Sequence, residues 1–470
     1  MLVDHVVTAT VATVRAGQRV RILDPACGDG RFLVAAAEAV RQAGGVAELT
    51  GVDIDLGGLH AAGLLGDVEA IEADALAHDW GSRRFDVIVG NPPFLSQLAS
   101  ATARDGGSRF GGGPYADAAA DFLALAVRLA VDDGGRVGLV LPTSLLTARD
   151  AGPIRCEVAA HATMEWFWAS RDLMFDAAVR TCAIGFRRDA TAVLTAAGPS
   201  PTIARSAGAD FVRIEPVVAP AATPNDHWGW LIADSHGLPP VPPIHAAGTV
   251  ADHALVTANF RDQYYGLVGA VRDDADGPPL ITTGLIDPGR CHWGERSTRF
   301  AKQRFDAPRV DRSTLVPFMQ RWADRCLVPK VLVATQSRVL EAVVDEAGAW
   351  LPAVPVIRVV PNQQESLWQI AAVLTSPVAS ALIAEQSVGS GLSAATVRVS
   401  QRTLGQLAWP AGALTAAVGA LRSGDLAACG RAVDAAYGVH DETLSGWWWD
   451  HVSHAAADRR RYSGAGDECG

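Results

Sequence analysis

The chain has 470 residues, 49% of them hydrophobic, and a formal net charge of −11 at pH 7. This length and apolar content exclude a disordered protein and are enough to bury the cores of two domains with a small further segment. The acidic balance also excludes nucleic-acid binding over the whole surface, because phosphate contacts need Lys and Arg, and leaves room only for a local basic patch.

Seven cysteines are scattered along the chain without a Cys-x-x-Cys pair. An odd, scattered set is typical of reduced thiols, so we expect neither disulfides nor a structural metal. No apolar run approaches the roughly 20 residues that a membrane span needs, and the first residues lack the pattern of a signal peptide. The composition therefore predicts a cytoplasmic protein that makes no use of a membrane.

The chain begins with a predicted helix over residues 1–16 and a predicted strand over 19–23. A turn from Asp24 to Gly30 then leads into a second helix. Its glycines let the backbone approach a ligand at the helix N-terminus. A Gly-x-Gly alone is weak evidence, since any tight strand-to-helix turn can contain one.

Acidic residues follow the next two predicted strands. The strand 48–52 leads directly into Asp53, about 20 residues beyond the glycines, where an acidic side chain in this kind of fold binds both ribose hydroxyls. A third short strand ends near Asp74. Its carboxylate either accepts a hydrogen bond from an adenine amino group or caps the following turn, and the residues alone leave both interpretations open.

Asn91-Pro92-Pro93-Phe94 follows the apolar stretch 85–90, which predicts a buried strand ending at the sheet edge where open α/β folds bind ligands. The prolines remove two backbone donors, so the segment presents mainly acceptors, the Asn91 side-chain oxygen and the Pro92 carbonyl. Such a corner can hold an aromatic amine such as N6 of adenine while Phe94 stacks on the ring. The alternative is a rigid turn without chemistry.

The ordered set Asp24-Pro-Ala-Cys-Gly-Asp-Gly, Asp53-Ile-Asp, Asp74 and Asn91-Pro-Pro-Phe resembles the gamma-class, TaqI-like N6-adenine DNA methyltransferases. The resemblance implies a Rossmann-like domain that binds S-adenosylmethionine. It also implies that Asn91, Pro92, Pro93 and Phe94 are catalytic and hold the target adenine. The cofactor-binding residues that it implies are Asp24, Ala26, Gly28, Gly30, Phe32, Asp53, Ile54, Asp74 and Asn91.

Phe175 lies between predicted strands at 164–168 and 181–186. In the family, a Phe in the corresponding loop stacks on the flipped adenine, so the resemblance implies a catalytic role for Phe175; the alternative is a core aromatic. The chain departs from the family in lacking a Thr-Pro pair before the first helix and in having Asp29 where Ser or Thr is usual. The first departure implies either a truncated start or a different cofactor lid.

A helix over 116–131 and a strand over 136–141 continue the alternation that predicts a parallel sheet, whereas 216–224 is expected to be loop. After a Pro-rich boundary at 237–243, patterns up to Pro410 resemble the TaqI-like specificity domain. Residues 290–338 contain eleven basic and four acidic residues, a composition that fits phosphate and base contacts or, alternatively, a solvated basic face. The predicted DNA-binding residues are Arg296, Arg299, Lys302, Arg304, Gln336 and Arg338.

We therefore predict an α/β protein with a Rossmann-like class I S-adenosylmethionine-dependent methyltransferase domain over 1–240. An α+β target-recognition domain is predicted over 245–412, followed by a small helical appendage over 413–470 in which Trp447–Trp449 pack as a cap.

The expected activity is methyl transfer to N6 of a flipped-out adenine in double-stranded DNA, in a restriction-modification or phage-defence setting. We expect a monomer, with any restriction or defence partner encoded separately. Two alternatives remain from the sequence: a methyltransferase of the same fold acting on RNA or on a protein glutamine, and a DNA-binding regulator that has lost catalysis.

Overall fold

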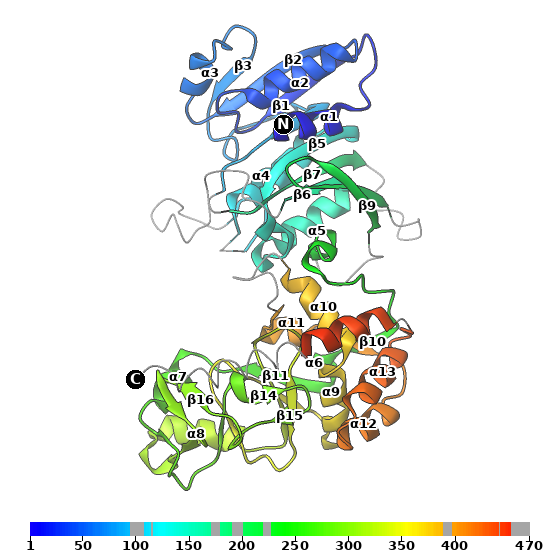
Figure 1. Cartoon of the computed structure of the whole chain (residues 1–470). Coiled ribbons are helices and arrows are strands. Elements are labelled where there is room, and N and C mark those ends of the chain that lie inside the picture. The colour runs from blue at the N-terminus through cyan, green and yellow to red at the C-terminus, as the bar shows by residue number, and fades with distance from the viewer. Residues whose placement is uncertain are drawn as a thin grey trace, which may run out of the picture. The chain divides into compact units, whose positions relative to one another are not determined.

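Figure 1 shows a computed structural model of the chain, which describes residues 1–94, 108–113, 116–170, 179–189, 201–219, 227–388, 397–440 and 442–452. The chain folds into two compact units, Met1–Leu231 and Ile232–Gly470. The first unit contains one large sheet flanked by helices. The second combines a smaller sheet, several short strand pairs and helices.

One nine-stranded sheet runs through the first unit. Its strands are β1 (Arg19–Asp24), β2 (Val46–Asp53), β3 (Glu69–Glu72), β4 (Val87–Gly90), β5 (Asp133–Pro142), β6 (Ala162–Ala169), β7 (Thr181–Asp189), β8 (Thr202–Ala207) and β9 (Val212–Val218). Their order is β3-β2-β1-β4-β5-β7-β6-β8-β9. β1 to β5 pair in parallel, whereas β7 is antiparallel to both of its neighbours. The parallel, Rossmann-like arrangement that the sequence predicts is thereby confirmed.

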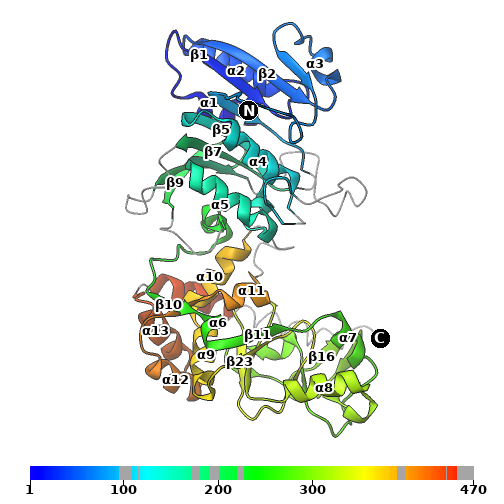
Figure 2. The ribbon, with the colours of Figure 1, turned by 180° about the vertical axis from the view of Figure 1, so that it is seen from behind.

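Helices cover both faces of this sheet. They are α1 (Leu2–Val11), α2 (Arg31–Gln42), α3 (Gly57–Ala61), α4 (Ala118–Leu129) and α5 (Gly152–His161), with short 3₁₀ turns at Thr143–Leu146, Arg149–Ala151 and Gly229–Leu231. Val7 of α1 and Leu33 of α2 are buried in one core with Ile22 of β1. Since successive strand residues face opposite sides, Ile88 and Leu139 face the other side, where α4 and α5 pack together (Figure 2).

Sequence periodicity located β1, β2, β4, β5, β6 and β7 correctly, and the helix expected over 116–131 is α4. The loop expected over 216–224 is wrong at its start, because Pro216 lies within β9. β9 is the edge strand of the sheet, so a residue without a backbone N–H can be accommodated there.

The second unit is built on a four-stranded antiparallel sheet. Its strands, in spatial order, are β11 (Ala254–Ala258), β23 (Ile357–Pro361), β19 (Lys330–Val333) and β21 (Ala342–Asp345). The short strands are β10 (Ala246–Thr249), β12 (Val271–Arg272), β13 (Leu280–Ile281), β14 (Ile286–Asp287), β15 (Arg290–Cys291), β16 (Thr298–Phe300), β17 (Gln303–Phe305), β18 (Arg309–Val310), β20 (Gln336–Ser337), β22 (Leu351–Pro352), β24 (Val397–Arg398) and β25 (Ala408–Pro410).

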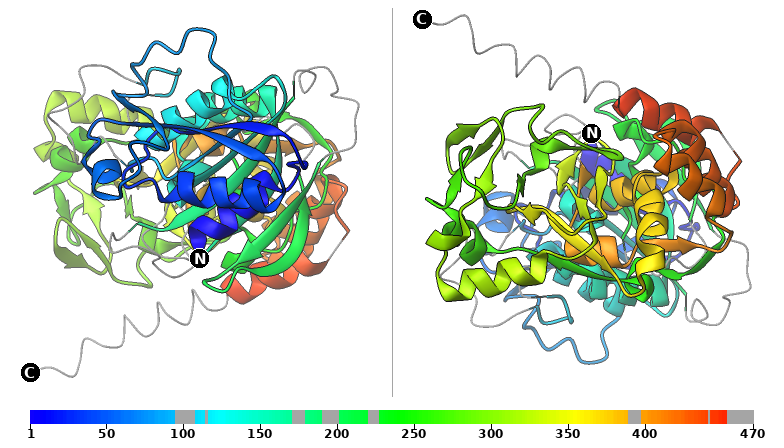
Figure 3. Two further views of the ribbon diagram at one scale, coloured as in Figure 1. Left: turned by 90° about the horizontal axis from the view of Figure 1, so that it is seen from above. Right: turned by 90° about the horizontal axis from the view of Figure 1, so that it is seen from below.

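The helices of the second unit pack in two cores, one of which includes that sheet. They are α6 (Val250–His253), α7 (Arg261–Leu267), α8 (Pro317–Cys326), α9 (Leu367–Leu374), α10 (Pro377–Ser387), α11 (Gln401–Gly405), α12 (Thr415–Arg422) and α13 (Leu426–Ala436), with 3₁₀ turns at Asp234–His236, Thr283–Leu285, Arg312–Thr314 and Gln364–Ser366. A further helix spans 442–452. Leu421 of α12 and Val433 of α13 are buried in one core with Val331 of β19. Figure 3 (right) shows the orange α12 and α13 beside the yellow α9.

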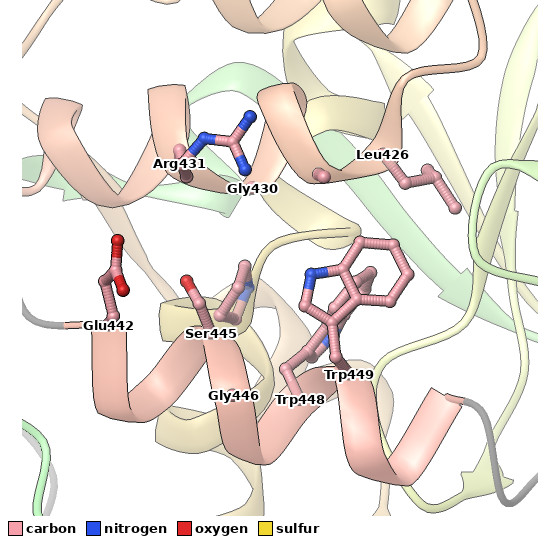
Figure 4. A pocket seen from close by; sticks show the side chains of 10 residues that line it. Leu426, Gly430, Arg431, Glu442, Ser445, Gly446, Trp448 and Trp449 are labelled. Carbon is pink, nitrogen blue, oxygen red and sulfur yellow. The ribbon is translucent and has the colours of Figure 1, made fainter.

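The tryptophan run lies in the helix 442–452. Trp448 is fully buried, and its Nε1 donates a hydrogen bond of 3.1 Å to Ser380 Oγ, as expected of a packed cap. Trp448 and Trp449 also line a pocket of about 260 Å³ between this helix and α13, together with Arg431 and Glu442 (Figure 4). The described residues between 413 and 452 are therefore packed within the second unit.

Candidate active site

The predicted site residues of the first unit gather at one edge of its sheet. β1 to β4 are parallel, so their carboxyl ends lie on the same side. Asp24 ends β1, Asp53 ends β2, and Asn91 follows β4 directly. Asp53 pairs with Glu72 at the end of β3, which places Asp74 just beyond the same edge. Four segments far apart in sequence thus meet where this fold class binds ligands.

The glycine turn between β1 and α2 has its own steric requirements. Gly28 and Gly30 have φ values of 50° and 79°, which L side chains rarely adopt. The Cys27 N–H donates to the Val52 carbonyl at 3.0 Å, which ties the turn to β2. A Cβ on Gly30 would lie 2.6 Å from Leu64 Cδ1, whereas a Cβ on Gly28 would meet nothing. Gly30 is therefore required by the close packing of Leu64, whereas the backbone of Gly28 stays exposed at the site.

Asp24 is buried beneath this edge, with a relative exposure of 1%. Its Oδ1 accepts a hydrogen bond of 3.1 Å from the Ala26 N–H. Burial raises the pKa of Asp24 to about 7; the Ala26 hydrogen bond lowers it, and the nearby charges of Asp53 and Asp29 raise it further. A Cβ on Gly90 would lie 2.5 Å from Asp24 Oδ1, so Gly90 is a site residue that the sequence analysis missed. Its signal was a glycine at the strand end directly before Asn91.

The raised pKa of Asp24 predicts a pH dependence of stability. Between its ordinary value of 3.8 and about 7, the folded protein holds a proton that the unfolded chain has lost, so the free energy of unfolding falls as pH rises through this window. Asp24→Asn should remove this dependence. We expect the melting temperature of the variant, relative to wild type, to be higher at pH 8 than at pH 4.5 in ligand-free thermal unfolding. A difference that does not change with pH would contradict the burial effect.

Asp53 links the second strand to the glycine turn. Its Oδ2 accepts a hydrogen bond of 2.8 Å from the Gly28 N–H, and its Oδ1 accepts one of 3.3 Å from the Asp55 N–H. The intervening Ile54 is 75% exposed, so an apolar side chain stands open beside the carboxylate. A Cβ on Gly58 would lie 2.5 Å from the Gly28 carbonyl oxygen, so α3 packs closely against the turn. A carboxylate beside an exposed apolar side chain suits a sugar that carries a flat aromatic ring.

Asp74 caps its own turn, because its Oδ1 accepts a hydrogen bond of 3.0 Å from the Leu76 N–H. This is the second of the two interpretations that the sequence left open, while a role toward adenine stays a prediction. Its Oδ2 also lies 3.9 Å from Arg109 Nη2. Arg109, from the segment 108–113, is thus brought to this edge by the fold, and sequence spacing carried no signal for that contact.

The Asn-Pro-Pro-Phe segment presents its polar residue to solvent. Asn91 and Pro93 are exposed and Pro92 is buried. Within the described part of the chain, the Asn91 side chain has no hydrogen-bond partner. Phe94 is half-buried and packs against the core formed by α1, α2 and the sheet. Phe175, the predicted partner for base stacking, lies outside the described residues.

Phe32, predicted to bind the cofactor, has its side chain in this same core and is 8% exposed. Only its backbone, in the first turn of α2, remains open to a ligand. Helix N-termini carry N–H groups without intrahelical partners, which favour an anionic group such as a carboxylate. A contact through Phe32 would therefore be made by its backbone.

The structure separates the predicted DNA-binding residues into two groups. Arg296 is held within the second unit by bidentate bonds of 3.1 and 2.8 Å to Asp287 and by one of 2.9 Å to the Gly284 carbonyl. Gln336 is exposed in β20, and Arg338 is half-buried and already has partners. The remaining three, Arg299, Lys302 and Arg304, are exposed on the β16–β17 hairpin.

Among the described residues, no group of three or more His, Cys, Asp or Glu is arranged to hold a metal ion. In the same part of the chain, no single helix is long and apolar enough to cross a membrane, although one pair bent by 68°, 364–374 with 377–386, meets the length and composition criteria together.

The family match to known proteins lies in the first unit. Residues 4–194 match the family model of N-6 DNA methylases. No curated protein matches the chain. Similar solved structures include a protein of Listeria monocytogenes assigned as a class I S-adenosylmethionine-dependent methyltransferase, with 18% identity over 44% of this chain and 62% of that chain and a TM-score of 0.34.

Two further structures are a type I restriction-modification methyltransferase subunit of Streptococcus thermophilus and the type IIG restriction endonuclease BpuSI. The first has 18% identity over 44% of this chain and 46% of that chain, with a TM-score of 0.35. The second has 13% identity over 97% of this chain and 65% of that chain, with a TM-score of 0.37. The chain thus spans less than two thirds of the length of each of these structures.

The sheet order gives the first unit the Rossmann-like fold of class I methyltransferases, followed in this chain by a further domain. The methyl donor of this class is S-adenosylmethionine. Residues 4–194 of this unit match the family model of N-6 DNA methylases.

Proposed function

We propose that this chain is a site-specific DNA methyltransferase of the gamma, TaqI-like class that transfers a methyl group from S-adenosylmethionine to N6 of adenine in double-stranded DNA. The observation that carries the proposal is the position of Asn91-Pro92-Pro93-Phe94. This segment follows β4 at the sheet edge where Asp24 and Asp53 also stand, in a region that matches the N-6 DNA methylase family.

The residues at this edge fit S-adenosylmethionine. Gly28 leaves open backbone, and a cationic methionine group bound above the buried Asp24 would favour the ionised form of its carboxyl group. In this proposal the ribose hydroxyls donate to Asp53 and the adenine ring packs on the exposed Ile54, with Asp74 just beyond the end of β3. When bound, the cofactor supplies an activated methyl group as an electrophile.

The protein's own part in the reaction is to hold the target amine. The Asn91 side-chain oxygen and the Pro92 carbonyl accept the two amine hydrogens, so the nitrogen lone pair is aimed at the methyl group. Positive charge develops on the nitrogen as it is methylated, and both acceptors stabilise that charge most strongly at this stage. The proton then leaves to solvent, and no covalent enzyme intermediate is needed.

The proposed substrate is duplex DNA, from which the adenine is flipped into the site at some cost in stacking energy. The second unit takes the role of target recognition in this proposal. The exposed cations Arg299, Lys302 and Arg304 on the β16–β17 hairpin support this role of the second unit. We further propose that the protein acts as a monomer in a restriction-modification or defence setting, with a restriction or defence partner encoded separately.

Purified protein incubated with S-adenosylmethionine and genomic DNA free of N6-methyladenine should produce N6-methyladenine in one recurring sequence context, as read by modification-sensitive sequencing. The same protein should transfer no methyl groups to bulk RNA or to glutamine-containing protein extract. Methyl transfer to RNA or protein alone would favour the other acceptor classes, and DNA binding with no transfer to any of the three would favour a regulator.

A further inference from the structure

The β16–β17 hairpin of the second unit has two chemically different faces. Arg299 pairs directly with Arg304, whereas Thr298 pairs with Phe305. Directly opposed residues project from the same face of a ribbon, and neighbours along each strand project from opposite faces. Phe300 and Phe305 are buried in the core that contains α8, so the two arginines occupy the outer face.

This outer face lacks the acidic partners that Arg290, Arg296 and Arg312 of the same segment have. Arg290 pairs with Glu295, and Arg312 pairs with Asp324. In contrast, Arg299, Lys302 and Arg304 make no hydrogen bond or ion pair within the described residues, which include all of 290–338. Two arginines directly opposite each other repel, so their placement costs stability unless an anion joins them.

The tip of the hairpin is tight and strained. Only Ala301 and Lys302 connect the strands, with φ values of 48° and 67°. Positive φ at both loop residues is typical of the type I′ turn, in which Asn-Gly is the favoured pair, and the Cβ atoms of Ala and Lys make the conformation costly. The turn places Lys302, which is exposed, at the end of the ribbon.

We propose that the β16–β17 hairpin enters the major groove of double-stranded DNA as a two-stranded ribbon, with Arg299, Lys302 and Arg304 neutralising backbone phosphates. This inference rests on the proposed function, because it names the surface through which that enzyme holds its substrate. The major groove is wide enough for a two-stranded ribbon, and phosphates supply the anions that the opposed arginines lack. Tyr264 of α7, whose ring lies 5.2 Å from that of Phe300, supports the ribbon on its inner face.

The test measures the affinity for a random-sequence DNA duplex as a function of salt concentration. Each phosphate contact contributes about 0.9 to the slope of log K against log salt, so Arg299→Ala with Arg304→Ala should reduce the magnitude of that slope by about 1.8. The matched control is Arg321→Ala with Arg325→Ala on α8, which removes the same charge from the same unit and should leave the slope near the wild-type value. Arg299→Lys with Arg304→Lys should also keep the slope, because Lys binds phosphate as a point charge.

Thermal unfolding should show that the Ala variant is at least as stable as wild type, since an opposed pair of like charges is removed. An unchanged slope in the Ala variant, or Lys variants as weak as the Ala variants, would overturn the hairpin proposal even if the wild-type enzyme methylates DNA. Conversely, wild-type protein that binds the duplex through the hairpin but transfers no methyl group would overturn the proposed function alone. Wild-type protein that binds no duplex would overturn both.

Discussion

Asn91→Ala should reduce kcat for DNA methylation by about 10² to 10³-fold, the range seen when one preorganised polar contact to a developing charge is removed. The loss should fall on kcat because the contact of Asn91 with the amine strengthens as the amine becomes cationic. Affinities for S-adenosylmethionine and for duplex DNA should change little, since the Asn91 side chain is exposed and its removal breaks no hydrogen bond within the described residues. Single-turnover kinetics with calorimetry of both ligands would measure these quantities.

Asn91→Asp provides the matched variant. A carboxylate keeps an acceptor oxygen at the same distance from the backbone, so it should recover a substantial part of the activity lost in Asn91→Ala. If Asn91→Ala methylates DNA at the wild-type rate, the amine is held elsewhere and the segment is only a turn. If both variants are equally inactive and also unfold at lower temperature, the role of Asn91 is structural.

Asp53→Ala should weaken S-adenosylmethionine binding severely. Two hydrogen bonds from ribose hydroxyls to a charged acceptor contribute roughly 1.5 to 3 kcal/mol each at most, which corresponds to a rise in Kd of about 10² to 10⁴-fold. The variant also removes the acceptor for the Gly28 N–H, which lies 2.8 Å from Asp53 Oδ2, so the glycine turn loses one of its hydrogen bonds to β2 and keeps the one from the Cys27 N–H to the Val52 carbonyl. Isothermal titration calorimetry with S-adenosylmethionine would measure the effect.

Asp55→Ala is the control for charge, because Asp55 stands two residues further on and its Oδ1 accepts only the local Gly57 N–H at 2.8 Å. We expect its Kd to stay close to wild type. Asp53→Asn keeps an acceptor for Gly28 but loses the charge, and its Kd should therefore lie between those of wild type and Asp53→Ala. If Asp53→Ala and Asp55→Ala raise the Kd for S-adenosylmethionine equally, the negative charge of this region contributes to binding and specific hydrogen bonds from Asp53 do not.

For the candidate DNA surface, the sequence indicated the basic segment 290–338 but not which of its residues are available to DNA. The excess of arginine in 290–338 drew attention to this region, but composition treats every arginine alike. The structure distinguishes them: Arg296 is held by Asp287, nine residues before it, whereas Arg299 and Arg304 face outward from a ribbon. An ion pair depends on which side chains meet in space. The opposition of Arg299 and Arg304 likewise depends on the register in which the two strands pair, and composition shows neither.

By itself, the sequence determined β1 to β7 and the helices α1, α2 and α4 of the first unit, but not α3, α5, β8 and β9. It also determined the placement of Asp24, Asp53 and Asn91 at strand ends. These features follow from local periodicity, glycine and proline geometry, and the rule that parallel strands end at a common edge. Only the tertiary structure decided that Gly90 must be glycine beside Asp24 and that Arg109 meets Asp74. Those contacts join residues distant in sequence, and their distances depend on how the whole sheet and its connections pack.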